Sequence, residues 1–179
     1  NVFSAAMLLG VMRVVWASSE TLFGLPFTRE APAFAPITEE HPMLPENGYA
    51  LAKGLAEEMA RQMHRWNPDT SFIGLRISNI IDPSEYGMFT GWQEDPNIRR
   101  WNLWGYVDCR DVALACRLGL AARVEGAEVC LVAASDTCMT RPSADLMAEV
   151  FPSVPLTRRV EGRETLLSID RARRVLGYE

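Results

Sequence analysis

Runs of apolar residues alternate with more polar segments along the chain and predict strands and helices in turn. Short apolar runs bounded by polar or turn-forming residues predict buried strands at 12–18, 71–77 and 128–134. Apolar positions at helical spacing predict helices at 1–10, 48–66, 108–122, 142–150 and 168–176. Because strands alternate with helices, we expect an α/β fold built on a parallel sheet.

Two long segments carry no periodic pattern. Residues 24–47 contain prolines at intervals, and residues 80–106 are irregular and rich in aromatic side chains. A loop of such length inside a compact domain usually has a function. We therefore expect 24–47 to form one wall of an active site.

The first predicted strand ends in two small hydroxyl residues, Ser18 and Ser19, before the chain turns towards Gly24. In open α/β sheets, ligands bind outside the carboxyl ends of the strands. A serine delivered to that end is therefore a candidate site residue. Both serines are candidates, although for Ser18 a small residue at a strand end is the simpler explanation.

Tyr49 and Lys53 form the second candidate pair, and Lys53 is the only lysine in the chain. Residues four apart on a helix share one face, so the phenol and the ammonium can point at the same place. An arginine cannot replace a compact, flexible point charge. On its own, a Tyr-x-x-x-Lys spacing is more often a coincidence, with the lysine in solvent, and its surroundings must decide.

A serine followed after about thirty residues by Tyr-x-x-x-Lys resembles the short-chain dehydrogenase/reductase superfamily. The chain is more closely similar to its extended branch, the NAD-dependent epimerase/dehydratase family. The segments that carry this resemblance are 13–19, 23–24, 38–42, 45–49 and 75–79. The resemblance covers nearly the whole chain and implies a Rossmann-like sheet with a small C-terminal substrate lobe.

The resemblance implies a role for each candidate residue. Tyr49 would be the catalytic base, and Lys53 would favour its phenolate form and hold the nicotinamide ribose, because an ammonium stabilises a nearby anion. Ser19 would donate a hydrogen bond to the reacting oxygen. Tyr49, Lys53, Ser18 and Ala17 would contact the cofactor, NAD or NADP, and Ser19 would also contact the substrate.

One part of the family pattern has no counterpart here. The Gly-rich turn that holds the cofactor pyrophosphate at a helix N-terminus is not found, and residues 1–11 resemble the second half of the helix before the Ser strand. We therefore expect residues 1–179 to be a partial NAD(P)-binding domain whose N-terminal strands are missing. Within it, segments at about 79–107 and 135–170 would form the substrate lobe.

The substrate side is less clearly marked. The candidate contacts are Glu20, Thr21, Asn79, Arg99 and Arg100. Strand-end capping explains Asn79 equally well, and a surface loop explains either arginine somewhat better. The arginines suit bidentate binding of a carboxylate or phosphate.

The reaction is narrowed by two comparisons within the family. Dehydratases carry an Asp-Glu pair where this chain has Glu20 and Thr21, which disfavours dehydration. The short C-terminal lobe has a weaker resemblance to uronate dehydrogenases. We expect an oxidoreductase or epimerase acting on a sugar or sugar acid; the alternatives are a nucleotide-sugar 4-epimerase and a non-catalytic binding module.

Composition adds limits on partners and compartment. The net charge is −5 at pH 7, from 18 basic and 23 acidic residues, which argues against nucleic acid or anionic membranes as partners. The four cysteines have no metal-site or redox spacing and predict reduced thiols in a cytoplasmic protein. His41 is expected in a solvated loop, and no metal site is expected.

The sequence also carries an expectation about how copies of the chain assemble. Helices 1–10 and 48–66 correspond to the pair through which family members commonly dimerise, so we expect a homodimer. The strand at 12–18 would lack one neighbour, leaving Val14, Val15 and Trp16 uncovered, and such exposed edges recruit partners.

Overall fold

The computed structural model describes residues 1–179, and its centre is a three-stranded parallel sheet. Its strands are β1 (Arg13–Ser19), β2 (Ser71–Ile77) and β5 (Ala127–Val132), in the order β1-β2-β5. Arg13 pairs with Ser71, and Phe72 pairs with Ala127. This confirms the expected α/β fold, and the strand and helix positions match the predicted ones within a few residues.

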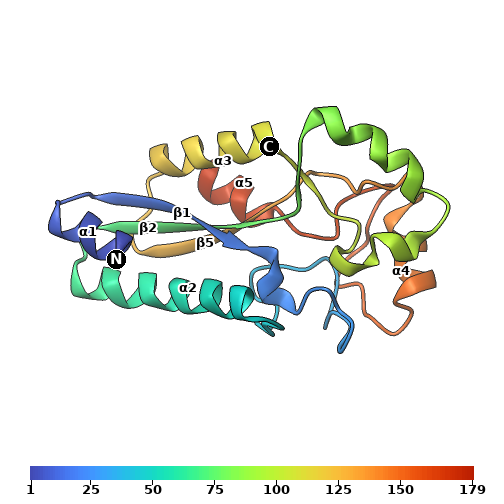
Figure 1. The fold of residues 1–179 in the computed structure, drawn as a ribbon, viewed down its shortest axis with the longest axis horizontal. Coiled ribbons are helices and arrows are strands. Elements are labelled where there is room, and N and C mark those ends of the chain that lie inside the picture. The colour runs from blue at the N-terminus through green and yellow to red at the C-terminus, as the bar shows by residue number, and fades with distance from the viewer.

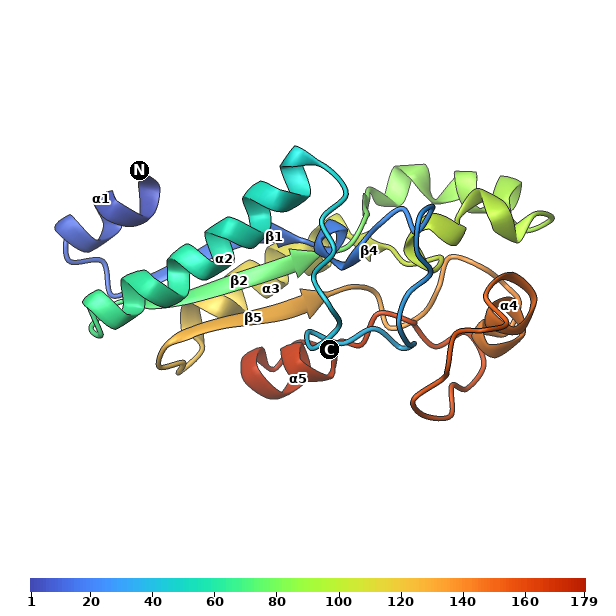
Figure 2. The same cartoon turned by 90° about the horizontal axis from the view of Figure 1, so that it is seen from below.

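Helices cover both faces of the sheet (Figure 1). On one face lie α1 (Val2–Leu8) and α2 (Gly48–Trp66), and on the other lie α3 (Cys109–Ala121) and α5 (Asp170–Leu176). Figure 2 shows that the remaining chain, with α4 (Ser143–Val150), gathers beyond the carboxyl ends of the strands. Most of the irregular chain therefore lies at one end of the sheet.

That end is more ordered than the sequence indicated. Residues 80–106 were expected to be irregular, yet they contain several short elements. These are β3 (Ile80–Ile81) and the 3-10 helices η2 (Pro83–Trp92), η3 (Pro96–Ile98) and η4 (Arg100–Asn102), while η1 (Glu20–Phe23) follows β1. β3 pairs in parallel with a strand the sequence did not predict, β4 (Val107–Asp108). Two-residue strands give no periodic signal, which is why the pattern missed them.

Side-chain caps explain where the main helices begin. Asn47 accepts a hydrogen bond from the backbone N–H of Ala50 and starts α2, and Asp108 accepts one from Arg110 and starts α3. Asn and Asp are favoured at this position because their oxygens satisfy an N–H that has no helical partner. The α2 cap lies two residues before Tyr49, so it fixes Tyr49 in the first turn of the helix.

Small residues let the layers approach closely. A Cβ at Gly119 of α3 would lie 3.1 Å from the Val15 side chain, and one at Gly74 of β2 would lie 2.8 Å from the Trp16 indole. A larger residue at either position would push a helix or a strand partner away, because interiors are close-packed. The Trp16 indole also meets the Phe3 ring of α1 edge-on at 5.6 Å.

The strand β1 is an edge of the sheet, because it pairs only with β2. The expectation that Val14, Val15 and Trp16 would be uncovered is wrong in degree, since all three are half-buried. The reason is that α1 and α3 cover the two faces of β1, so that only its hydrogen-bonding edge is open.

A buried ion pair joins α2 to the sheet. Glu57 of α2 contacts Arg76 of β2 through two hydrogen bonds of 2.7 and 2.9 Å, and their side chains are 0% and 4% exposed. Ser18 of β1 donates a third hydrogen bond, 2.6 Å long, to the same carboxylate. One carboxylate therefore fixes α2 relative to both β1 and β2.

The same arginine holds the long loop. Arg76 donates to the backbone carbonyl of Glu39 at 3.0 Å, and its guanidinium lies 5.0 Å from the centre of the Phe23 ring. These contacts bring residues 24–47 back against the end of β2. The loop and the helix that follows it are thus fixed by one side chain.

The predicted environment of His41 is wrong. It was expected in a solvated loop, but it is only 2% exposed, and its Nε2 accepts a hydrogen bond from the Ala33 N–H at 2.9 Å. Its ring packs against Phe23 and Phe34. The loop folds back on itself and uses His41 as an internal hydrogen-bonding residue, which local sequence polarity does not reveal.

None of the helices combines the length and the apolar character that crossing a lipid bilayer requires.

Replacing Arg76 with methionine should destabilise the fold strongly, because Glu57 would remain buried and charged without its partner. Breaking such a pair costs about 3–5 kcal/mol in the free energy of unfolding. Urea unfolding measures this. Arg61→Ala, which breaks the exposed pair with Glu58, is the control and should change the free energy of unfolding far less, because solvent screens an exposed pair.

The double variant Glu57→Leu/Arg76→Met should lose much less than Arg76→Met alone, since it leaves no unpaired charge. Equal losses for the single and the double variant would contradict this account of the ion pair.

Candidate functional site

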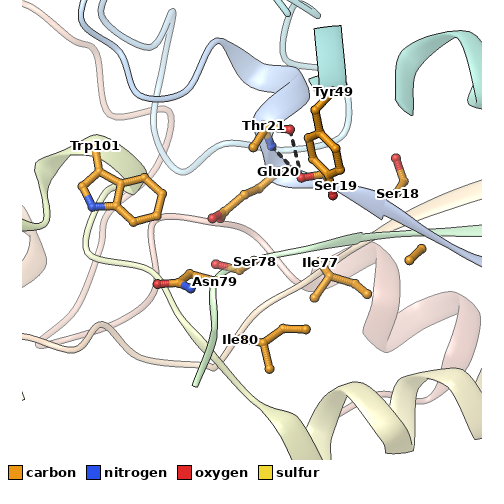
Figure 3. Close-up of a pocket in the computed structure, with 11 residues that line it drawn as sticks. Ser18, Ser19, Glu20, Thr21, Tyr49, Ile77, Ser78, Asn79, Ile80 and Trp101 are labelled. Atoms are coloured by element: carbon orange, nitrogen blue, oxygen red, sulfur yellow. Dashed lines mark hydrogen bonds between the residues drawn. The ribbon is translucent and has the colours of Figure 1, made fainter. Parts of the chain in front are cut away.

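A cavity of about 440 Å³ opens at the carboxyl ends of β1 and β2. It is lined by residues 17–21 of β1 and η1, Tyr49 of α2, residues 77–80 after β2, and Trp101 of η4. Figure 3 shows these side chains converging on one space. This is the position at which open α/β sheets bind ligands.

One face of α2 presents three successive side chains, two of which contact β1. Tyr49, Lys53 and Glu57 are spaced four residues apart, so they stack along that face. Glu57 receives the hydrogen bond from Ser18, and Lys53 donates from Nζ to the Ala17 carbonyl at 2.6 Å. These two contacts hold the helix in register with the strand, so that Tyr49 lies at the cavity.

Lys53 lies beside Tyr49 without a direct hydrogen bond to the phenol. Its Nζ is 5.3 Å from the centre of the Tyr49 ring. The ring is 58% exposed, so the phenol is open to a ligand. An ammonium at this distance adds positive electrostatic potential at the ring.

Ser19 is oriented by Thr21. The Ser19 hydroxyl oxygen accepts hydrogen bonds from the Thr21 backbone N–H at 3.2 Å and from the Thr21 hydroxyl at 2.9 Å. Both are accepted bonds, so the Ser19 proton stays free to be donated. Ser19 and Tyr49 line the same cavity, and Thr21 acts here through Ser19.

Asn79 is oriented by Arg99. The Arg99 Nη2 donates to the Asn79 side-chain oxygen at 2.8 Å. With its oxygen occupied, the amide of Asn79 has its NH₂ group left for a ligand in the cavity that it lines. The predicted contact residue Arg99 thus acts in this structure as a support for Asn79.

The structure does not place either of the arginines predicted as substrate contacts, Arg99 and Arg100, in the lining of the cavity. Arg99 is buried with its guanidinium 4.5 Å from the Trp92 ring centre and 4.7 Å from that of Trp101. Arg100 lies elsewhere, with its guanidinium 5.1 Å from the centre of the Phe151 ring. Neither lines the cavity. Neighbours in sequence on a 3-10 turn point in different directions, which the sequence alone did not resolve.

Glu20 lines the cavity as a buried carboxyl, only 3% exposed. Burial raises its pKa from the ordinary 4.5 to about 7, and this rise is partly offset by Ser78, Asn102 and the positive charge of Arg99. Asn102 donates to its Oε1 at a long 3.4 Å. At neutral pH this carboxyl is therefore divided between its neutral and charged forms.

The sequence analysis missed several residues that shape the site. They are Glu57, Arg76, Ser78, Trp101 and Asn102. Two of them left a signal, because Glu57 interrupts the buried face of α2 and Arg76 interrupts an apolar strand, and charges at such positions are almost always paired. The other three come from an irregular segment or a strand end, where no periodicity identifies a site residue.

No group of three or more His, Cys, Asp or Glu side chains in the structure is arranged to hold a metal ion. All four cysteines are free thiols.

The family follows from comparison with known sequences. The family model described as "NAD dependent epimerase/dehydratase family" matches residues 1–97, more than half of the chain. The chain therefore belongs to the NAD-dependent epimerase/dehydratase family, as the sequence resemblance indicated. Over 98 residues it is 34% identical to a UDP-glucose 4-epimerase of Bacillus subtilis, a match that covers 55% of this chain and 26% of that protein.

Solved structures share the fold. RMD from Pseudomonas aeruginosa, complexed with NADPH, superposes with a TM-score of 0.65 at 20% identity, covering 100% of this chain and 64% of RMD. MoeE5, in complex with UDP-glucose and NAD, superposes with a TM-score of 0.62 at 22% identity, covering 99% of this chain and 62% of MoeE5. The chain thus spans less than two thirds of either structure.

Replacing Glu20 with glutamine should change how stability depends on pH. The pKa of Glu20 is higher in the folded state, about 7, than in the unfolded state, 4.5. Its contribution to the stability of the fold is therefore fully present below pH 4.5 and is lost as the pH rises to about 7. Between pH 4.5 and 7, the free energy of unfolding of the wild type should therefore fall by up to about 3 kcal/mol relative to that of Glu20→Gln.

Thermal or urea unfolding at a series of pH values measures the difference between the two proteins. Glu125→Gln, an exposed site, is the control and should track the wild type. A difference between wild type and Glu20→Gln that does not change between pH 4.5 and 7 would contradict the assignment.

Proposed function

We propose that this chain supplies the substrate-facing part of an NAD(P)-dependent enzyme that oxidises or epimerises a carbon bearing a hydroxyl on a sugar or sugar acid. The observation that carries the proposal is that Tyr49 and Ser19 line one cavity at the carboxyl end of β1, with the Lys53 ammonium 5.3 Å from the centre of the Tyr49 ring. The family assignment and the folds of NAD- and NADPH-bound relatives support it.

The proposed chemistry begins with proton removal. Tyr49, in its phenolate form, accepts the proton of the substrate hydroxyl, and the positive charge of Lys53 stabilises that phenolate. Ser19 donates its free proton in a hydrogen bond to the same substrate oxygen, where charge changes during the reaction. When bound, the nicotinamide cofactor would accept the hydride that leaves the carbon bearing the hydroxyl, and it could return the hydride to either face of the resulting carbonyl.

The chain's residues fit one end of that cofactor. Lys53 and the Ala17 carbonyl it contacts lie at the open edge of β1, next to Tyr49. They are placed to hold a ribose hydroxyl beside the reacting carbon, and Ser18 lies next along the strand. The chain's residues offer no matching cradle for a pyrophosphate, so we assign them only the nicotinamide-ribose end.

Two substrate classes fit the proposal. The compact segments at 79–107 and 135–170, which we assign to the substrate lobe, favour a small sugar or sugar acid. The 34% sequence identity over 98 residues to a UDP-glucose 4-epimerase favours a nucleotide sugar. In both cases Asn79 and Thr21 would lie near the sugar ring.

We also propose that the protein is cytoplasmic, because all four of its cysteines are free thiols.

A non-catalytic binding module is the candidate from another class. It would keep the cavity but use neither the Tyr49 phenol nor the Lys53 ammonium. The arrangement of Ser19, Tyr49 and Lys53 at one cavity supports the enzyme instead.

Tyr49→Phe should lower turnover of the whole protein roughly 10²-fold or more, because it removes the proton acceptor while keeping the ring. Lys53→Met should weaken cofactor binding as well. Turnover is followed by the absorbance of reduced nicotinamide, and cofactor affinity by calorimetry. Tyr86→Phe, a hydroxyl outside the cavity, is the control and should stay close to wild type. Normal turnover of Tyr49→Phe would refute the mechanism.

We further propose a homodimer through α1 and α2. Leu51, Leu55 and Met59 form an exposed apolar stripe along α2, and Leu8 and Leu9 are exposed on and after α1. An apolar stripe of this kind is typical of a surface that another protein covers. A second copy of the chain presents the same stripe and would cover it symmetrically.

Leu55→Glu should convert this dimer to a monomer, because it places a charge in the middle of the apolar stripe. Sedimentation velocity measures the change. Leu120→Glu, an exposed leucine of α3 on the opposite face, is the matched control and should leave the dimer intact. A wild-type chain that sediments as a stable monomer would rule the dimer out.

A further inference from the structure

The cavity has an inner end that the proposed chemistry does not use. Figure 3 shows the Glu20 side chain pointing away from the Tyr49 ring, towards Ser78 and Asn79. Asn102, which is fully buried, lies behind the same carboxyl and contacts it at 3.4 Å. We call Glu20, Ser78 and Asn102 the inner subsite.

The inner subsite has hydrogen-bonding capacity that the protein does not fill. Oε2 of Glu20 and Oδ1 of Asn102 are buried without a partner, and the Ser78 hydroxyl lies beside the carboxyl without reaching hydrogen-bonding geometry. Buried polar atoms in folded proteins nearly always have partners. Two of these groups, Glu20 and Ser78, line the cavity, which indicates that a ligand bound there supplies their partners.

The charges at the inner subsite decide what kind of ligand fits. The nearest cation is Arg99, which does not line the cavity. Its Nη2 donates to Asn79 at 2.8 Å and to the Gly105 carbonyl at 3.1 Å, so both Nη2 protons are used, and its Nε is buried without a partner. Its flat faces are covered by Trp92 and Trp101. No free fork of N–H donors is therefore presented to an anion.

A hydroxyl group, in contrast, matches the subsite in either protonation state of Glu20. A neutral carboxyl can donate to and accept from a hydroxyl, and a charged one can accept from it. A ligand carboxylate can only accept, and next to charged Glu20 it would be repelled without a compensating cation.

We propose that Glu20 determines substrate specificity by binding a second, non-reacting hydroxyl of the sugar and excluding a carboxylate at that position, so that neutral hexose rings are preferred over uronates. This inference rests on the proposed function and deepens it, because it chooses between the neutral sugars and the sugar acids. Trp101 supplies an apolar wall of the same cavity against which the carbon side of a sugar ring can pack.

The preference for neutral rings should grow with pH. Burial raises the pKa of Glu20 to about 7, so the repelling charge is present mainly above that value. The polar and titratable groups around Glu20 are Ser78 and Asn79 after β2, Arg99 and Asn102 around η4, and Tyr49 across the cavity. Among them only Arg99 is a cation, and the contacts above engage it.

UDP-glucose and UDP-glucuronic acid test this directly, because they differ only in a hydroxymethyl group against a carboxylate. Calorimetric binding to the whole protein with NAD is measured at pH 6 and pH 8 for wild type, Glu20→Gln and the exposed control Glu125→Gln. Free glucose and glucuronate form a second pair, and UDP alone measures the contribution of the nucleotide. These measurements need no turnover.

We expect wild type and Glu125→Gln to prefer the neutral sugar by about tenfold or more at pH 8, with a smaller preference at pH 6. Glu20→Gln should reduce this preference severalfold at pH 8 and leave the affinity for UDP unchanged. Sugars that bind with the same preference in wild type and Glu20→Gln would overturn the inference and leave the proposed function standing. A protein that binds neither pair of sugars would overturn both.

Discussion

The buried ion pair between Glu57 and Arg76 is the interaction on which the rest of the site depends. It fixes α2 against β2, and through Ser18 it fixes the same helix against β1. Two buried charges are stable only when each satisfies the other, so this contact tolerates little movement of either element. Tyr49 lies two turns before Glu57 on the same face of α2, so the position of the phenol at the cavity is set by a residue outside it.

This arrangement separates two kinds of group within one cavity. Tyr49 and Lys53 lie at the open edge of β1, where a cofactor and solvent can reach them, and the Lys53 ammonium lies 5.3 Å from the centre of the Tyr49 ring. Glu20 lies at the closed end, where burial favours the neutral carboxyl. Two acidic groups in such different surroundings can therefore be used for different tasks on one sugar, one for proton transfer and the other for recognition.

The sequence predicted α2 and β2 to the residue, because each has a long periodic pattern with a clear cap or turn at its ends. It also predicted that Tyr49 and Lys53 share one face of α2 and that Ser19 opens at the cavity that Tyr49 lines, since strand ends and helix faces follow from the pattern. The choice of these three residues came from the family resemblance. It could not place Arg100, which turns to Phe151, or His41, which is buried, because their positions depend on loops that fold back from distant parts of the chain. Glu57 and Arg76 were visible as isolated charges in buried elements, but only the structure shows that they meet.

A crystal structure of the whole protein with NAD and a bound sugar substrate would test the central claim most directly. The account predicts that one sugar oxygen lies within about 3.2 Å of both the Tyr49 Oη and the Ser19 Oγ. It also predicts the Lys53 Nζ beside the nicotinamide ribose. A sugar bound at this cavity with its reacting carbon facing the nicotinamide, but with neither Tyr49 nor Ser19 in contact with its oxygen, would contradict it.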